Sequence, residues 1–309
     1  PKSVVVEQKA GGAVKRLPWY KRLWEWFIGF FVNEYELVVW FHNETDISVD
    51  GLKTVRRTKK EFLLKSINSC LNQNYKTKEI LIFDDCSLDS SRQILKNINK
   101  KNTFVTFNKK KKYKSGPLNQ LYATKNLFSR SKGEIIFLID SDDYYKKNKI
   151  KYIVKYFKSN KNLNFIQDTP KYGNVEKIFK FKRKKNSFTI WPSVYPTSCL
   201  AIKRKFFLNF LKLSKQGEFP NLEIDARLCI YAFLKNEYSS IKKNFTIYNY
   251  DENGITSMYK KFTFNWWRKR NEAYDYMKFL MKKMNKKFIP GYDYYFTKLV
   301  NCFIKNEIH

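Results

Sequence analysis

Three carboxylates within four residues form the stretch of this sequence with the clearest chemical potential. Asp140, Asp142 and Asp143 follow residues 135–139, an unbroken apolar run that predicts a strand buried on both faces. Carboxylates are costly to desolvate unless a cation meets them. A divalent ion held by Asp140 and Asp142 would do so, because Mg²⁺ and Mn²⁺ favour oxygen ligands and commonly bind phosphates as well. The alternative is an acidic turn in which Asp142 or Asp143 caps the next helix.

A second acidic pair, Asp84 and Asp85, follows another apolar run at residues 79–83. Ligands of open α/β sheets lie just outside the carboxyl ends of the strands, so adjacent parallel strands would bring both acidic clusters to one edge. One cluster would accept hydrogen bonds from a nucleobase, and the other would hold a metal on a diphosphate. Asp225 heads a predicted apolar helix and is a candidate general base.

The elements that would position these residues alternate between strand and helix patterns up to about residue 158. This alternation is typical of βαβ units and predicts an α/β fold with a mostly parallel sheet. The predicted helices cover about 58–71, 89–99, 118–128 and 150–157, and the predicted strands 79–83, 103–108 and 135–139. Further on, we expect strands at 165–167 and 188–191, an apolar segment at 197–202, a helix from Glu223, and helices in the tail from about 262.

Composition limits the classes of partner. The formal charge of +33 implies anionic partners, namely nucleic acid, a phospholipid surface or phosphate-bearing substrates. The lysines are scattered along the chain, which disfavours nucleic acid as the partner. Five widely spaced cysteines without a CxxC pair argue against disulfide and zinc frameworks and fit a reducing compartment. With His42 and His309 as the only histidines, a histidine base is disfavoured too.

The first 57 residues have a different character. Trp24–Val32 is Trp-rich and follows several basic residues, which fits either a segment in a bilayer interface or an ordinary core helix. Glu36–Phe41 predicts a strand. No stretch reaches the roughly 20 apolar residues that a membrane span needs, and no signal-peptide cleavage pattern is evident.

From about Thr58 to Met277 the chain resembles a family 2 glycosyltransferase of the GT-A fold. Any one of the matching pieces is a weak signal, whereas their shared order and spacing make a specific one. The matching stretches are Ser69–Gln73, Glu79–Ser90, Ala123–Asn126, Lys132–Glu134 and Leu138–Asp143.

The resemblance implies a nucleotide-sugar donor, linked to UDP or GDP. Asp84 and Asp85 match the acidic pair that contacts the base. Asp140 and Asp142 match the DXD motif that binds Mg²⁺ or Mn²⁺ on the diphosphate, with Asp142 as the favoured direct ligand. Asp225 is similar to the base that deprotonates the acceptor hydroxyl in members that invert the anomeric centre.

Several basic and aromatic residues are further candidates for phosphate or acceptor contacts. Lys114 is the one we assign to nucleotide binding, although a surface role is the favoured alternative for it and for the others. The others are Arg204, Trp266, Trp267, Arg268 and Arg270. The chain also departs from the family, because Lys53–Thr58, where the first strand should fall, is too charged for a central strand. Either Glu36–Phe41 supplies that strand or the strand is degenerate.

The sequence therefore predicts a Rossmann-like GT-A core at 58–230, an atypical segment at 1–57 and a C-terminal acceptor-side helical region at 231–309. The segment at 1–57 is either membrane-interfacial or a separate module. The expected activity is metal-assisted, inverting transfer of a hexose-type sugar to a hydroxyl of a glycan or lipid-linked acceptor, in polysaccharide or cell-envelope synthesis. The expected location is the cytoplasm, with peripheral attachment to the inner face of an anionic membrane as an option.

Three alternatives remain. A nucleotidyltransferase would also use acidic strand ends and magnesium, but no Gly-rich phosphate loop is visible near the first strand. The others are a non-catalytic GT-A domain and a basic module that binds nucleic acid.

Overall fold

The fold was analysed in a computed structural model, which describes residues 59–87, 89–173, 192–214, 217–250 and 259–306. The chain divides by its internal contacts into two compact units, Pro1–Glu36 and Leu37–His309, and every described residue belongs to the second. The segments predicted at Trp24–Val32, Glu36–Phe41, Lys53–Thr58 and 188–191 lie outside the described residues.

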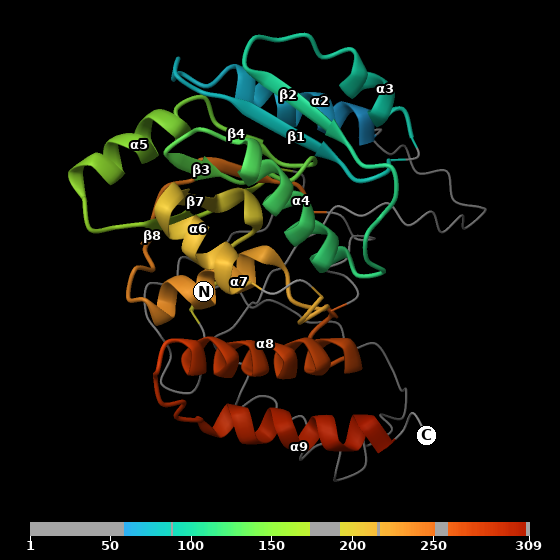
Figure 1. The fold of residues 1–309 in the computed structure, drawn as a ribbon, viewed down its shortest axis with the longest axis vertical. Helices are drawn as coiled ribbons and strands as arrows, with labels where there is room; N and C mark the ends of the chain where they lie inside the picture. Colours follow the sequence, from blue (N-terminus) through green and yellow to red (C-terminus); the bar gives the residue numbers. More distant parts are fainter. Residues whose placement is uncertain (1–58, 88, 174–191, 215–216, 251–258, 307–309) are drawn as a thin grey trace, which may run out of the picture. The chain divides into compact units, whose positions relative to one another are not determined.

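The first sheet pairs β1 (Ile80–Asp84) in parallel with β2 (Thr103–Phe107). Helices α2 (Lys59–Leu71) and α3 (Ser91–Lys96) cover it (Figure 1). Leu63 and Ile67 project from the apolar face of α2, Leu95 comes from α3, and Ile82 and Val105 of the two strands pack against them. The predicted apolar face of α2 is thus confirmed for Leu63, Ile67 and Leu71, whereas Leu64, expected on the same face, is 37% exposed.

The second sheet has the order β3-β7-β5-β8. Its strands are β3 (Ile135–Phe137), β7 (Leu200–Lys203), β5 (Phe165–Asp168) and β8 (Ser240–Ile241). Strand β7 lies between β3 and β5 and is antiparallel to both, whereas β5 and β8 are parallel. Alternate side chains of β3 enter two different clusters, with Ile136 in one and its two neighbours in the other. Both faces of β3 are therefore packed, as the apolar run predicts.

The main core forms where four helices meet one face of this sheet. They are α4 (Gly116–Arg130), α6 (Arg204–Leu213), α7 (Ile224–Leu234) and α8 (Phe264–Lys283). Helix α7 is apolar almost all round and is correspondingly buried along nearly its whole length. The last helix, α9 (Tyr292–Asn306), packs on α8 (Figure 1). Helix α5 (Lys149–Ser159) covers the other face, where Ile153 and Phe157 meet Ile166 of β5.

A third, small sheet follows the acidic run directly. Its order is β4 (Tyr144–Tyr145), β9 (Thr246–Tyr248) and β6 (Lys171–Tyr172), with β9 antiparallel to β4 and parallel to β6. The stretch that follows Asp143 is therefore held by a strand from much later in the chain.

The sheets differ from the prediction in two respects. Among the described residues three strand pairs are parallel and three antiparallel, so the sheet is mixed rather than mostly parallel. In the same part of the chain, β3 is paired with β7 and not with β1. The reason is the fully buried segment 200–202, which takes the central position between β3 and β5. None of the described helices is both long enough and apolar enough to cross a bilayer.

Candidate active site

The acidic loop, residues 138–143, leaves the end of β3 and is fastened from several directions. Within the loop, the Asp143 N–H donates to the carbonyl of Asp140 at 3.2 Å. From outside, the Ser66 hydroxyl of α2 donates to that same carbonyl at 3.2 Å. The Asp140 N–H donates to the hydroxyl of Ser198 at 3.0 Å, in the 3₁₀ turn Thr197–Cys199. The backbone of Asp140 is thus fixed before any ligand arrives.

Asn249 fastens the second half of the loop. Its backbone N–H donates to the carboxylate of Asp143 at 3.0 Å, and its side-chain amide donates to the carbonyl of Asp142. Asn249 directly follows β9, so the pairing of β9 with β4 delivers it to the loop. The sequence offered no signal for this residue, because its role depends on a contact 106 positions away.

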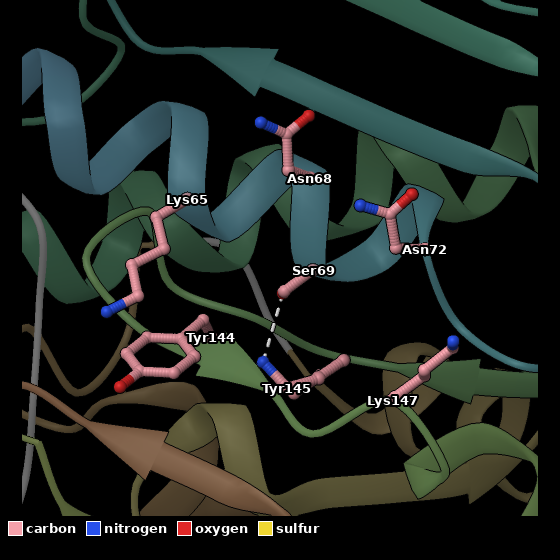
Figure 2. A pocket seen from close by; sticks show the side chains of 7 residues that line it. All are labelled: Lys65, Asn68, Ser69, Asn72, Tyr144, Tyr145 and Lys147. Carbon is pink, nitrogen blue, oxygen red and sulfur yellow. Dashed lines mark hydrogen bonds between the residues drawn. The ribbon is translucent and has the colours of Figure 1, made fainter.

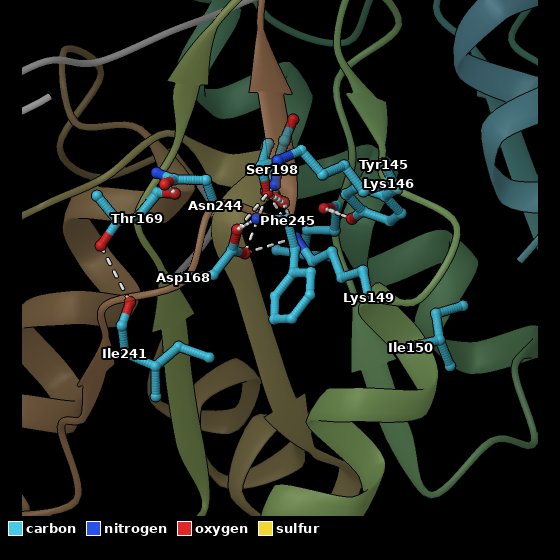
Figure 3. A network of polar contacts seen from close by, with 12 residues as sticks. Tyr145, Lys146, Lys149, Ile150, Asp168, Thr169, Ser198, Ile241, Asn244 and Phe245 are labelled. Carbon is cyan, nitrogen blue, oxygen red and sulfur yellow. Dashed lines mark hydrogen bonds and ion pairs between the residues drawn. The ribbon is translucent and has the colours of Figure 1, made fainter. Parts of the chain in front are cut away.

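A buried ion pair contacts Ser198, the residue that fastens Asp140 (Figure 3). The Lys149 ammonium is 2.8 Å from the carboxylate of Asp168, and both side chains are wholly buried. Lys149 also donates to the carbonyl of Ser198 and, at 2.7 Å, to the hydroxyl of Thr246. Asp168 accepts further hydrogen bonds from the N–H groups of Phe245 and Thr246. A pair with this many partners is compatible with burial, and it fixes the segment that carries Ser198.

Gln120 of α4 joins the acidic loop to the start of α7. Its side-chain carbonyl accepts from the Ile224 N–H at 3.2 Å, and its side-chain amide donates to the hydroxyl of Thr197 at 3.5 Å, in the turn whose Ser198 fastens Asp140. Asp225 is the next residue of α7; it is fully buried and accepts from the Ala226 N–H at 2.6 Å. The carboxylates of Asp140 and Asp225, which the sequence placed in separate motifs, therefore lie in one electrostatic environment.

These carboxylates repel one another in a poorly solvated place. Burial raises the pKa of Asp140 well above its usual value, and the charges of Asp143, Asp142 and Asp225 raise it further. The pKa of Asp143 is raised by burial and by Asp142, and the pKa of Asp225 is raised by burial and by Glu223. One carboxylate oxygen in each of Asp140, Asp143 and Asp225 is buried without a hydrogen-bond partner among the described residues. A cation bound here would relieve this repulsion.

The carboxylates at the end of β3 fit a divalent metal ion that also binds a phosphate group of a ligand. In the described part of the chain, no three His, Cys, Asp or Glu side chains converge as a complete metal-binding group. Mg²⁺ commonly takes one or two carboxylates from the protein and its remaining ligands from phosphate and water. At the end of β3, the carboxylates of Asp140 and Asp142 are the residues that would supply that protein share.

The predicted base-binding pair lies on the other sheet. Asp84 ends β1 and is 3% exposed, accepts from the Ser87 N–H and pairs with the Arg92 guanidinium at 3.3 Å. Asp85 is half-buried and accepts from the Asn108 amide at 2.7 Å. Their partners all belong to the β1–β2 region, and no described contact joins them to the acidic loop.

The remaining candidates divide between surface and packing positions. Lys114 is exposed in the connection between β2 and α4, and Arg268 is exposed on α8. Arg204 donates to the carbonyl of Gly133 at 2.7 Å and lies over the ring of Phe128, which is a structural role. The others pack as well, since Trp267 is 4% exposed and in ring contact with Trp266, and Arg270 pairs with Asp293.

Two surface cavities lie outside the acidic loop. Figure 2 shows the first, between α2 and β4, where the Lys65 ammonium lies 3.8 Å from the centre of the Tyr144 ring and Ser69 accepts from the Tyr145 N–H. The second lies between the connection before α7 and the pair α8–α9, and Glu272 is among its lining residues. Neither cavity includes a carboxylate of the acidic loop.

Comparison with known proteins adds the family context. The model of the family described as glycosyl transferase family 2 matches residues 53–213. An uncharacterised glycosyltransferase of Rickettsia bellii is 26% identical over 54% of this chain and 24% of its own length. The hyaluronan synthase of Pasteurella multocida is 23% identical over 79% of this chain and 28% of its own length. This chain therefore spans less than a third of either relative.

A solved structure supports the fold. The crystal structure of S. aureus TarS in complex with UDP-GlcNAc superposes with a TM-score of 0.53, covering 71% of this chain and 63% of that chain. The sequence identity is 16%, so this likeness bears on the arrangement of the elements alone.

Proposed function

Because this chain belongs to glycosyl transferase family 2 and has its GT-A fold, we propose that it transfers a sugar from a nucleotide-sugar to an acceptor hydroxyl, with inversion and with help from a divalent metal. One observation carries the proposal. Gln120 links the turn Thr197–Cys199, which fastens Asp140 through Ser198, to the start of the helix that bears Asp225, and both acids have a buried carboxylate oxygen without a described partner. A metal carboxylate and a base are the two groups that such a reaction requires.

In this proposal the acidic loop holds the donor diphosphate. Asp142 and Asp140 would hold Mg²⁺ or Mn²⁺, which when bound stabilises the charge of the departing nucleoside diphosphate. The fastening of the loop by Ser198 and Asn249 keeps these carboxylates in place without reorganisation during the reaction.

The acceptor is activated by Asp225. A carboxylate whose pKa is raised by burial is a stronger base than an exposed one, so Asp225 suits the removal of a proton from a hydroxyl. We propose a glycan or lipid-linked saccharide as the acceptor. The similarity to a relative named hyaluronan synthase, over most of this chain, favours such a saccharide.

The nucleotide part of the donor is assigned to Asp84, Asp85 and Lys114. A carboxylate accepts hydrogen bonds from the N–H groups of uracil or guanine, and Asp85 is the more exposed of the two acids. Lys114 is exposed and free to approach a phosphate. The donor is a UDP- or GDP-linked sugar, and the UDP-GlcNAc bound by the solved TarS structure makes UDP the first nucleotide to test.

Calorimetric titration with UDP and GDP, with and without Mn²⁺, tests the donor site. We expect metal-dependent binding of one nucleotide to the wild type and its loss in Asp142→Asn. The Asp225→Asn variant should keep this binding and lose transfer by about 10²- to 10⁴-fold, the usual contribution of a general base. Failure of both nucleotides to bind under any metal condition would instead favour a non-catalytic GT-A domain.

A further inference from the structure

The outer face of α9 carries a row of exposed apolar side chains, which we call the α9 stripe. It consists of Ile289, just before the helix, and Tyr292, Tyr295, Leu299 and Phe303, whose exposed fractions run from 55% for Leu299 to 80% for Tyr292. Within the helix, the steps of three and four residues place these side chains on one face. Of the nine exposed large hydrophobic side chains among the described residues, five belong to this stripe, so the clustering is not the usual scatter of a protein surface.

The opposite face of α9 is fixed against α8. Asp293, Thr297, Asn301 and Ile304 are buried there. Asp293 pairs with Arg270 of α8, and the amide of Asn301 donates to the carbonyl of Trp267 at 3.1 Å. These polar contacts would be left unpaired if the helix rotated, so the stripe is held outward by the fold.

Positive charge lies at one end of the stripe, next to Ile289. Lys282, Lys283, Lys286 and Lys287 are all exposed in the last turn of α8 and the connection to α9. An apolar helix face with tyrosine and phenylalanine, bordered by lysines, is typical of a helix that lies in the interface of an anionic bilayer. A second copy of the chain is a poorer occupant, because two molecules that each carry +33 repel one another.

We propose that the α9 stripe docks on an anionic phospholipid bilayer, with α9 lying in the plane of the interface. The side chains of the stripe enter the boundary between headgroups and acyl chains, while the lysines contact lipid phosphates. A helix of 15 residues is about 22 Å long, which provides a contact line rather than a membrane span. This inference does not rest on the proposed transferase activity.

Vesicle co-sedimentation of the full chain tests the docking. The probes are vesicles of phosphatidylcholine alone and of phosphatidylcholine with roughly one-third phosphatidylglycerol. We expect the wild type to bind the second kind, and the variant Tyr295→Ser/Leu299→Asn/Phe303→Ser to bind at least about tenfold more weakly. The matched control, Phe104→Ser/Leu208→Asn, removes exposed apolar side chains of β2 and α6 and should bind like the wild type.

A probe on Cys302 keeps the test valid if the triple variant fails to fold. Cys302 is exposed next to Phe303, whereas Cys199 and Cys229 are buried. In a Cys70→Ser/Cys86→Ser background, a polarity-sensitive fluorophore on Cys302 should shift to the blue when anionic vesicles are added.

Three results would overturn the proposal. The first is a probe on Cys302 whose emission does not shift when anionic vesicles are added. The second is a folded triple variant that binds vesicles as well as the wild type does. The third is a wild-type protein that binds no vesicles but forms a dimer, which the stripe substitutions dissociate. Nucleotide binding measured without vesicles should be the same in the triple variant and the wild type. This measurement therefore distinguishes a failure of the proposed donor site from a failure of membrane docking.

Discussion

At the scale of single residues, Gln120 shows how the two halves of the proposed reaction are aligned. It lies on α4, far in sequence from both Thr197 and Ile224, yet its one side chain donates to the Thr197 hydroxyl and accepts from the Ile224 N–H. An amide can do this because it offers an acceptor and a donor on one rigid plane. We therefore regard Gln120 as a positioning residue that holds the turn behind Asp140 against the start of the helix that bears Asp225, the two acids to which the proposed function assigns the metal and the base.

Replacing Gln120 with leucine should slow transfer without removing donor binding. The substitution keeps the approximate volume but loses both contacts, so Asp225 and Asp140 are no longer held in register. We expect kcat to fall by about 10- to 100-fold, as for misplacements of about 1 Å, with the Kd for the nucleotide–Mn²⁺ complex within about twofold of the wild type. Steady-state kinetics with calorimetry checks this. A parallel loss of nucleotide affinity would show that Gln120 acts on the donor site instead.

The acidic residues of the site could be predicted from the sequence, whereas the residues that hold them in place could not. Asp140, Asp142 and Asp225 stand out because they follow or head apolar segments and match motifs of the family that the chain resembles. Ser198 and Asn249 are ordinary polar residues in sequence, and their value comes from contacts with the acidic loop across 58 and 106 positions. No local pattern encodes a partner that distant, so only the folded chain reveals them.

At the scale of elements, the small sheet β4-β9-β6 decides how well the acidic loop is held. Strand β6 brings Gly173 against the Asn249 side chain, and a Cβ added to Gly173 would lie 2.6 Å from the Asn249 carbonyl oxygen. It would also lie 2.7 Å from a methyl group of Ile247 on β9. The lack of a side chain at this position is therefore a packing requirement of the loop's support.

The substitution Gly173→Ala should weaken metal-dependent nucleotide binding, because Asn249 must move and releases Asp142 and Asp143. We expect about a 5- to 50-fold rise in Kd, equivalent to about 1–2 kcal/mol of lost positioning. The control is Gly133→Ala, where the added Cβ meets its nearest neighbour at an ordinary 3.5 Å. Calorimetry should show an unchanged Kd for the control. Equal effects of the two substitutions would contradict the role given to Gly173.

The ion pair between Lys149 and Asp168 makes a separate prediction about stability. In Lys149→Met the Asp168 carboxylate stays buried without its cation, so the free energy of unfolding should fall by about 3–5 kcal/mol. The double variant Lys149→Met/Asp168→Asn removes the uncompensated charge and should recover part of that loss. Urea denaturation of the two variants and of Asp168→Asn closes the cycle. Strictly additive losses would mean that the two side chains do not stabilise each other.

Several elements could be predicted from local pattern, and others could not. Helices α2, α7 and α8 were expected because their apolar periodicity or continuity is strong, and the structure confirms them. Strands β4, β6 and β8 have two residues each, too few to show any period. Helix α6 was not predicted, although Phe206, Phe207 and Phe210 share its buried face.

At the scale of the whole molecule, the charge of +33 raises the nucleic-acid alternative, which a salt titration tests. Binding to generic RNA through phosphate contacts should weaken by about 10³-fold or more between 50 and 200 mM salt if six or more phosphates are neutralised. We expect any RNA affinity to follow that steep slope, whereas UDP binding should depend on Mn²⁺ and change little. Metal-independent, salt-sensitive binding of UDP would favour the basic-module alternative.

The family and the fold class could be predicted because the matched motifs are spread over much of the chain, and the family match at 53–213 confirms them. The expected division at residues 57 and 230 stays a prediction. The core and the C-terminal helices lie in one contact unit, and α7 runs from Ile224 to Leu234 across the second expected boundary. A change in composition can mark where a segment ends. It does not show that one helix, here α7, continues across the expected boundary.

The position of Asn249 in the chain also bears on the order in which the protein is completed during synthesis. The ribosome delivers Asp142 and Asp143 more than 100 residues before the strand that carries their anchor. At about 5–20 residues per second, the nascent acidic loop waits on the order of 5–20 seconds for Asn249. A chain released early, even one that includes all of residues 53–213, would carry the acidic loop without its Asn249 contacts and without Asp225. Premature termination should therefore yield inactive products rather than weakly active ones.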